Sequence, residues 1–415
     1  MEQRLSLSRG VRGKSLMRQL LNIAHYEMLH IFKEKILFLM VFLVPLGYAA
    51  LFGAAYVTAV LNNVPIAIVD LDDSKLSREI ASAFANSPHF KVVDDIKTYP
   101  ELQEGMKNGR LRAGVVIPEH FEQKLARHEL TRVLTIYDGS NLIWGYNTRK
   151  YIREVFNEFS ASSTASYLAG MGYTKNEIRS IMDTVSLNTE VWYNPTFSYT
   201  NFLFLGLVMM ILHQIGLLSV SLTVTREKER KTWLQFLSAP VPAWKIFTGK
   251  AIPYFTANFF NYALLLWFAS RFVHVKIGGS LGLILVLGLL YDLVITGAGF
   301  LISLHASNSL QVTRYVMLLS VPFFMISGYT WPGTHIPVFI NYLARLLPST
   351  WMVLGFRQVA LKELDMSYVL PYIRALGLMA VLALFPAVTF AKRLTPRPQG
   401  GPVINNGPSY PARWK

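Results

Sequence analysis

Long runs of apolar residues alternate with polar stretches along most of this chain. A helix that crosses the hydrocarbon core of a bilayer needs roughly 20 apolar residues. We expect membrane-spanning helices in six segments: residues 36–60, 202–224, 252–270, 281–304, 315–331 and 375–391. The first run is longer than the apolar part of a signal peptide, which has about 7–15 residues, so a retained anchor is expected. The pattern predicts a polytopic α-helical membrane protein.

Residues 61–198, between the first two apolar runs, have the composition of a soluble α/β domain. Short apolar runs at 64–69, 113–117 and 133–137 are typical of strands. Apolar residues at helical spacing predict helices between and after them, and Thr174 and Glu177 are spaced as a capping box. The fold class is therefore a helical membrane bundle with an α/β domain inserted between the first and second spans.

Three aspartates, Asp70, Asp72 and Asp73, follow the first predicted strand. They are candidates for a cation site or for a turn and helix N-terminus, where acidic groups are favourable, and we favour the second. The domain shows no metal-ligand spacing, no nucleophile motif and no glycine-rich phosphate loop. We therefore expect it to bind or dock, with no catalytic residue, cofactor or metal.

The distribution of charge gives the orientation of the chain. Lys and Arg number 40 against 25 Asp and Glu, a net charge of +15, but they lie beside apolar runs and do not form a nucleic-acid patch. Residues 1–35, 225–250 and 392–415 carry seven, six and five Lys or Arg, whereas 271–280 and 328–374 carry six together. The positive-inside rule then predicts cytoplasmic termini and an external domain at 61–198. The chain has no cysteine, so disulfides and thiolate sites are excluded.

Two segments on the cytoplasmic side have amphipathic character. Residues 15–35 place apolar positions at helical spacing among basic ones, as in a helix lying in the membrane interface. Residues 225–250 begin with alternating charges and continue through an apolar stripe at Trp233, Phe236 and Leu237. We expect a short helix that offers this face to a cytoplasmic partner, with the charges setting the register of contact. The Pro- and Gly-rich tail, 392–415, is expected to be disordered and able to touch membrane lipid.

In this loop the chain resembles the ABC-2 type permease family, particularly its drug-exporter-like branch with a large external domain after the first span. The family's loop carries an acidic–basic run, Gly-Thr, a leucine-rich helix, a proline and Gly-Lys. The matching residues here are Glu229, Arg230, Thr232, Gln235, Leu237, Pro240, Gly249 and Lys250. Lys231 and Trp233 stand where the family usually has glycine and leucine.

A second stretch, residues 327–357, is similar to the family's external loop. The matching positions are Gly328, Pro332, Pro337, Pro348 and Arg357. The two later prolines would bracket a short helix dipping into the outer leaflet within the loop 332–370. Residues 69–77 also resemble the start of the family's external domain. The resemblance therefore covers nearly the whole chain.

The resemblance implies the permease subunit of an ATP-binding cassette exporter in a bacterial inner membrane. ATP and Mg²⁺ would be bound by a separate ATPase, and this chain has no G-x-x-x-x-G-K-[ST] motif. A second permease, identical or similar, would complete the pathway, and a periplasmic adaptor is a further candidate partner. The substrate class would be a hydrophobic or amphipathic drug, lipid or glycolipid. Coupling to the ATPase would involve Glu229, Arg230, Thr232, Trp233, Leu234, Phe236, Leu237 and Pro240.

Two ionisable residues lie inside predicted spans. Asp292 is midway along the fourth and His213 near the centre of the second. Such groups cost on the order of 3 kcal/mol to insert and usually face a bundle interior or cavity. For Asp292, a place in the pathway or a dimer contact stands beside a structural hydrogen bond between helices. For His213 we favour the structural bond.

Two other function classes are compatible with a helical membrane protein. A membrane-anchored receptor or scaffold would act through the external domain alone and has no need of the amphipathic cytoplasmic loop. An ion-driven transporter is expected to show inverted repeats and several intramembrane charges, and the sequence shows neither. The ATP-coupled permease is the hypothesis that uses all of these features.

Overall fold

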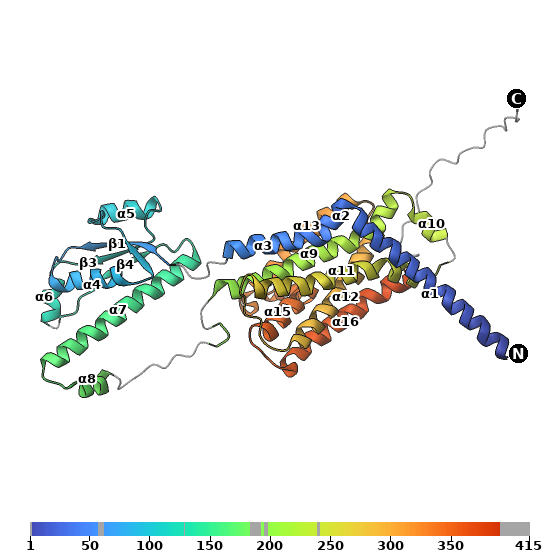
Figure 1. Ribbon diagram of the computed structural model, residues 1–415. Coiled ribbons are helices and arrows are strands. Elements are labelled where there is room, and N and C mark those ends of the chain that lie inside the picture. Colours follow the sequence, from blue (N-terminus) through green and yellow to red (C-terminus); the bar gives the residue numbers. More distant parts are fainter. Residues whose placement is uncertain are drawn as a thin grey trace, which may run out of the picture. The chain divides into compact units, whose positions relative to one another are not determined.

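The computed structural model describes residues 2–56, 62–127, 129–182, 192–194, 198–238 and 241–390, with side chains of the first helix from Met17 onward. The chain divides into two compact units (Figure 1). One is Thr58–Glu190; the other joins Met1–Val57 to Val191–Lys415. Pro240 and the predicted disordered tail, 392–415, lie outside the described residues.

The smaller unit is built on a four-stranded sheet in the order β2-β1-β3-β4. Its strands are β1 (Val64–Asp70), β2 (Phe90–Val92), β3 (Ala113–Ile117) and β4 (Leu134–Tyr137). β1 is parallel to both β2 and β3, and β4 is antiparallel to β3. The sequence predicts β1, β3 and β4 and misses β2, which has only three residues.

Helices cover both faces of this sheet (Figure 1). They are α4 (Lys75–Asn86), α5 (Tyr99–Lys107), α6 (Phe121–Ala126), α7 (Leu142–Gly170) and α8 (Lys175–Met182). Along β1, Val64 and Ile66 pack in the cluster that includes α4 and α7, whereas Ala67 and Val69 pack with Leu102 of α5. Because β1 is covered on both faces, it is an uninterrupted apolar run.

The three aspartates after β1 shape the chain. Oδ1 of Asp70 accepts the backbone N–H groups of Asp72 and Asp73 at 3.0 and 3.1 Å, which closes a tight turn. The carboxylate of Asp72 accepts the first two N–H groups of α6 at 2.9 and 3.1 Å. The N-cap of α4 is Ser74. These bonds are those of the turn and cap, and Asp72 caps a helix distant in sequence rather than the one that follows it.

The larger unit is a helical bundle. Its helices are α1 (Glu2–Lys33), α2 (Lys35–Phe38), η1 (Leu39–Leu43), α3 (Val44–Tyr56), α9 (Tyr199–Glu229), α10 (Trp233–Ser238), α11 (Ala243–Arg271), α12 (Leu281–His305), α13 (Ser309–Ile326), η3 (Gly333–His335), α14 (Val338–Arg345), α15 (Pro348–Ala360) and α16 (Met366–Phe390). Within the described residues, five helices are long and apolar enough to cross a membrane: Lys35–Ala55, Thr200–Glu229, Leu281–His305, Ser309–Ile326 and Met366–Thr389. They correspond to five of the six expected spans.

The remaining expected span, 252–270, lies in α11, a helix of 29 residues. Asn258 and Asn261 lower its apolar character, and both are buried within the bundle. α11 packs against α1, α9 and α12. One face of α11 is therefore buried in the bundle, whereas Ile252, Phe260 and Trp267 on another face remain exposed.

The first span contains one wide turn. η1 is a π-helical turn that ends at Leu43, two residues before Pro45. Proline has no N–H to offer the carbonyl four residues earlier, and π-turns relieve such sites. That carbonyl belongs to Val41, and it accepts Nδ2 of Asn261 at 2.7 Å. One of the two asparagines that weaken the hydropathy of α11 thus satisfies a backbone group of the first span.

The segment between the expected fifth and sixth spans is more helical than the sequence indicates. The expected fifth and sixth spans, 315–331 and 375–391, begin earlier in the structure, as α13 and α16. Between them, α14 follows Pro337 and α15 begins at Pro348. α15 packs against α9, α12 and α16. This segment therefore contributes a largely buried helix, α15, to the bundle.

Candidate coupling site

α9 ends in a left-handed turn directly before α10. Lys231 has φ +59°. Its N–H donates to the carbonyl of Lys228 at 3.0 Å, and the N–H of Thr232 donates to that of Glu227 at 2.9 Å. This pair of bonds is the Schellman motif, in which glycine is favoured because it has no Cβ. The departure from the family's usual glycine at Lys231 therefore falls on a position with a left-handed backbone.

α10 occupies the place where the sequence predicts a short amphipathic helix, but its apolar face is turned inward. Trp233 is 3% exposed and packs with Ile31 of α1 and Phe247 of α11. Phe236 and Leu237 are half-buried against the same cluster. The chain's own bundle therefore covers Trp233, whereas Phe236 and Leu237 keep part of their surface open, and the coupling role of this stripe stays a prediction. The outward side of α10 carries Leu234, which is 52% exposed.

The charged run at the end of α9 binds several helices. Nζ of Lys228 donates to the carbonyls of Leu304 at 2.5 Å and Ala306 at 2.9 Å, at the C-terminal end of α12. Glu229 accepts the N–H of Ser309 at 2.6 Å and its hydroxyl at 2.7 Å, at the start of α13. Both contacts place charges of the favourable sign at helix ends. α9 is thereby fixed to the α12–α13 connection.

Arg226 and Arg230 turn towards α1. Nη1 of Arg226 lies 3.1 Å from Glu34 Oε2, and its Nη2 donates to the hydroxyl of Tyr254 at 2.6 Å. Arg230 reaches the same Glu34 at 3.6 Å. His30 lies 2.8 Å from that carboxylate, while burial and the nearby Arg226 guanidinium lower the pKa of His30. Glu34 therefore collects contacts from two arginines and a histidine.

Lys250 of α11 is at the centre of the site. It is 1% exposed, and its Nζ lies 2.8 Å from Glu27 Oε2 and 2.9 Å from Glu227 Oε1. Glu27 also accepts the Tyr254 hydroxyl at 3.1 Å, and Glu227 accepts the Thr232 hydroxyl. One ammonium group thus joins α1, the end of α9 and α11. Lys250 Nζ also lies 4.9 Å from the ring centroid of Phe236 in α10.

Gly249 explains how α1 comes close enough for these bonds. A Cβ at this position would lie 2.7 Å from Cγ2 of Ile23 in α1, closer than real Cβ contacts. The Gly-Lys pair therefore has two roles here. Gly249 admits α1 against α11, and Lys250 pairs with its Glu27. We call the set Glu27, Glu34, Arg226, Glu227 and Lys250 the charged cluster.

Three members of this site, Glu27, Glu34 and Tyr254, are not predicted from the sequence. The two glutamates are seven residues apart in an otherwise apolar and basic segment, which places them near one helix face. That spacing is the only local signal of their role. Tyr254 is one of 20 tyrosines and carries no such signal.

The two ionisable residues predicted inside spans, His213 and Asp292, differ in their contacts. Nδ1 of His213 in α9 lies 2.6 Å from the hydroxyl of Tyr291 in α12, which is a hydrogen bond between helices. Asp292 is 6% exposed, and its Oδ2 has no hydrogen-bond partner within the described part of the chain. The His213 contact agrees with the structural hydrogen bond that we favour from the sequence. For Asp292, a place in the pathway or a dimer contact and a structural hydrogen bond both stay open.

The residues of the second family match, in the stretch 327–357, all occupy defined positions. Gly328 has φ +80°, Pro332 and Pro337 precede η3 and α14, and Pro348 is the first residue of α15. Arg357 donates to the backbone carbonyl of Tyr329, and its guanidinium carbon lies 4.0 Å from that ring's centroid. This loop is thus held by backbone geometry and by one arginine.

These features describe a helical membrane protein whose spans meet at a buried charged cluster beside a short helix. Residues 35–389 match the ABC-2 family transporter protein family, and the chain belongs to this family. It is the permease subunit of an ABC transporter, a membrane subunit without an ATPase domain. The family expected from the loop motifs is confirmed.

Several related permeases are similar to this chain along most of their length. The probable multidrug ABC transporter permease YbhR of Escherichia coli strain K12 is 28% identical over 75% of this chain and 82% of that protein. The inner membrane transport permease YhhJ of the same strain is 25% identical over 71% and 75%. The linearmycin resistance permease protein LnrN of Bacillus subtilis is 22% identical over 91% and 99%.

Proposed function

We propose that this permease exports hydrophobic or amphipathic compounds across a bacterial inner membrane, driven by a separate ATPase that binds ATP and Mg²⁺. The names of YbhR and LnrN support this substrate class, and that of YhhJ supports the membrane. A second permease, identical or similar, completes the pathway. The single observation that carries the coupling proposal is the charged cluster centred on Lys250.

The cluster can convert a movement of α10 into a movement of several helices. A partner that pushes on Leu234 displaces α10, and α10 is joined to α9 by the Schellman turn and to α11 through Phe236 and Lys250. α9 in turn holds α12 and α13 through Lys228 and Glu229. Packed elements with specific polar contacts transmit displacement as a unit. The ATPase therefore docks on the outward side of α10, in this proposal.

The proposed topology has six spans, with α11 as the third. Its 29 residues suffice for a span at about 1.5 Å per residue. Residues 1–35, 225–250 and 392–415 are cytoplasmic, and 61–198 is external. The basic residues of the three cytoplasmic segments support this orientation.

An apolar groove supports the substrate class. It has a volume of about 390 Å³ and lies between the first span, α9 and α13. Met40, Met210 and Met317 line it, together with Phe52 and Gln214. Methionine side chains adapt to ligands of different shape, which suits a surface that accepts several compounds. A second copy of the chain facing this groove would enclose it.

The docking proposal is tested by purifying the tagged chain in mild detergent and assaying ATPase activity in the eluate. The variant is Leu234→Glu, and the matched control is Leu130→Glu, since Leu130 is an exposed leucine of the external domain. Expression and membrane insertion are first shown to be equal. We expect activity to co-purify with the wild type and the control and to be lost with Leu234→Glu.

The other outcomes separate the parts of the proposal. If all three chains retain the ATPase, the partner is correct and the docking surface on α10 is wrong. If no ATPase accompanies the wild type in several detergents, the proposal of a separately purified ATPase partner is overturned.

A further inference from the structure

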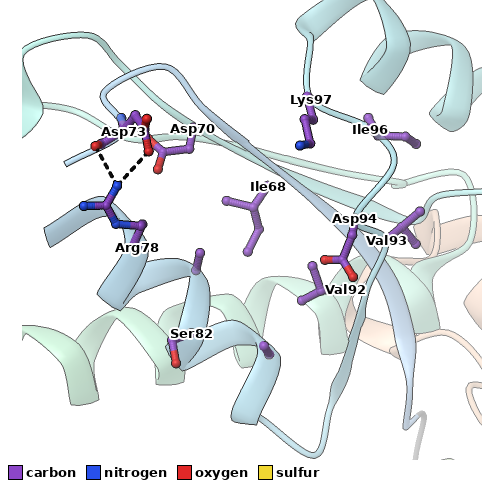
Figure 2. A pocket seen from close by; sticks show the side chains of 12 residues that line it. Ile68, Asp70, Asp73, Arg78, Ser82, Val92, Val93, Asp94, Ile96 and Lys97 are labelled. Carbon is purple, nitrogen blue, oxygen red and sulfur yellow. Dashed lines mark hydrogen bonds and ion pairs between the residues drawn. The ribbon is translucent and has the colours of Figure 1, made fainter. Parts of the chain in front are cut away.

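The external domain contains a groove that the permease function does not use. It has a volume of about 690 Å³ and lies where β1 and β2 end, beside α4. Figure 2 shows the side chain of Ile68 in the middle of the groove, with Arg78 and Ser82 on one side and Val92 and Asp94 on the other. In open α/β sheets, ligands bind outside the carboxyl ends of the strands.

One wall of the groove is a free strand edge. β1 has seven residues but pairs with β2 only at Val64, Pro65 and Ile66. The last bond of this ladder runs from the N–H of Val93 to the carbonyl of Ile66 at 2.9 Å, after which the chain turns away.

The backbone groups that follow on this edge are unpaired. Alternate residues of a strand direct their N–H and C=O groups to opposite neighbours. Pro65 and Leu71 bond towards β3, so Ile68 and Asp70 face the side of β2. Within the described residues of the domain, the N–H and C=O of Ile68 and the N–H of Asp70 have no hydrogen-bond partner. An exposed edge of this kind is a template for another extended chain.

The side chains around this edge favour the same type of ligand. The floor is apolar, formed by Ile68 and Val92 with Ala85 of α4. At the rim, Arg78 is paired with Asp73 at 2.8 Å, whereas Asp94 and Lys97 make no ion pair within the described residues. Two free charges of opposite sign beside an apolar floor complement a peptide with unlike charged ends or side chains.

We propose that this groove binds an extended polypeptide segment of a partner protein, which adds to the free edge of β1 as a short strand. The backbone of the segment bonds to Ile68 and Asp70, and a small apolar side chain fills the floor between Ile68 and Ala85. Asp94 and Lys97 select the charges at either end. This is recognition by β-augmentation, with main-chain bonds for affinity and pockets for specificity. It is independent of how the permease couples to ATP.

The chain has no cysteine, so a single introduced thiol reports on the groove. We would place it by Ser82→Cys in the groove and, as a matched control, by Ser166→Cys on α7, where the serine is also exposed. The intact chain in lipid nanodiscs is exposed to a heptapeptide library whose one fixed cysteine carries a 2-thiopyridyl disulfide. The protein thiolate displaces pyridine-2-thione, and the resulting disulfide adducts are measured by mass spectrometry. We expect a set of peptides to react at least tenfold faster at position 82 than at position 166.

Two further arms test the mode of binding. Ala85→Trp combined with Ser82→Cys fills the floor and should reduce the selected adducts to the control rate. The selected peptides with every backbone N–H methylated have no donor for the carbonyl of Ile68, and their methyl groups prevent close approach to the strand edge, so they should lose their advantage without any change in the protein. Equal rates at both cysteines would overturn the proposal. Undiminished reaction of the methylated peptides would also overturn it, and would indicate a ligand recognised by its side chains alone.

Discussion

Nζ of Lys250 in α11 lies 2.8 Å from Oε2 of Glu27 in α1, and both side chains are almost completely buried. Glu227 of α9 contacts the same ammonium group at 2.9 Å. A buried ion pair adds little net stability compared with apolar packing, but removing one partner is costly because the other charge is left in a poor solvent. The net contribution of the three residues to stability is therefore small, but the loss of one of them leaves the others as unpaired buried charges.

Removing the central cation should be far worse than removing one of its anions. Lys250→Met leaves Glu27 and Glu227 close together without a counter-charge, so we expect a loss of about 3–5 kcal/mol. Glu27→Gln keeps the pair with Glu227 and an acceptor for Tyr254, so we expect a loss of about 1 kcal/mol. Unfolding of both purified variants in mixed micelles would measure the difference. Equal losses would show that the cluster is not organised around Lys250.

The left-handed turn after α9 predicts an unusual response to glycine. Lys231→Gly relieves a conformation that costs roughly 1–2 kcal/mol for a residue with a Cβ, partly offset by the greater freedom of glycine in the unfolded chain. We expect a net gain of about 0.5–1 kcal/mol, whereas Lys231→Val should destabilise because it is β-branched. Melting of the detergent-solubilised chain, followed by tryptophan fluorescence, distinguishes them. A fall in Tm for both variants would contradict the role of backbone strain.

We attribute the bond between Asn261 and the carbonyl of Val41 to the missing N–H of Pro45, and this link can be tested. Asn261→Leu leaves the carbonyl without this donor and should cost about 1–3 kcal/mol. Pro45→Ala restores an N–H four residues after Val41, so the same Asn261→Leu change should cost less in that background. The double-mutant cycle is measured by unfolding in micelles. Strict additivity of the two changes would show that Pro45 and Asn261 are not linked.

The cap on α6 makes the α/β domain sensitive to acid. The hydroxyl of Ser74, and then the N–H groups of Glu122 and Phe121, hold the pKa of Asp72 below its usual range. The ionised carboxylate therefore contributes stability above the ordinary carboxyl pKa of about 4, and this contribution is lost as the pH falls through the lower folded-state pKa.

We expect Asp72→Asn to lower the Tm of the domain near neutral pH, and we expect this difference to shrink as the pH falls below the ordinary carboxyl pKa of about 4 towards the lower folded-state pKa. Scanning calorimetry of the intact chain at several pH values measures this difference. Asp94→Asn is the matched control, because Asp94 accepts no hydrogen bond within the described residues. A Tm difference for Asp72→Asn that is constant from pH 7 to pH 2 would exclude the cap as its source.

The elements that the sequence predicts well are those with a local signal. β1 and β3 are apolar runs bounded by polar residues, and the box of Thr174 and Glu177 begins α8 with the expected bonds. β2 has three residues, too few to show a period, and its pairing with β1 is a contact between distant segments. α11 is a long helix, but its asparagines lower the apolar character by which a span is recognised. Asn261 bonds to the carbonyl of Val41, 220 residues away, so the sequence around α11 does not show this partner.

The residues of the candidate site also divide into those that have a local sequence signal and those that do not. A short helix at 233–238 and a special backbone position near Lys231 can be inferred from spacing and from the family pattern. The direction in which Trp233 points cannot, since an amphipathic pattern defines an apolar face but not what covers it. Likewise, alternating charges predict ionic contacts, but Glu34 lies 192 residues from its partner Arg226. Such partners are determined by the fold as a whole.

The π-helical turn in the first span keeps the buried residues of that span on one side of the helix. Its buried residues recur at every fourth position: Leu37, Val41, Pro45, Ala49 and Gly53. In an uninterrupted α-helix of about 3.6 residues per turn, such a stripe would drift by about 40° at each step and wind off the bundle. One extra residue in η1 takes up most of that drift. The opposite face is therefore left continuously open from end to end, as a surface for lipid or for a second permease.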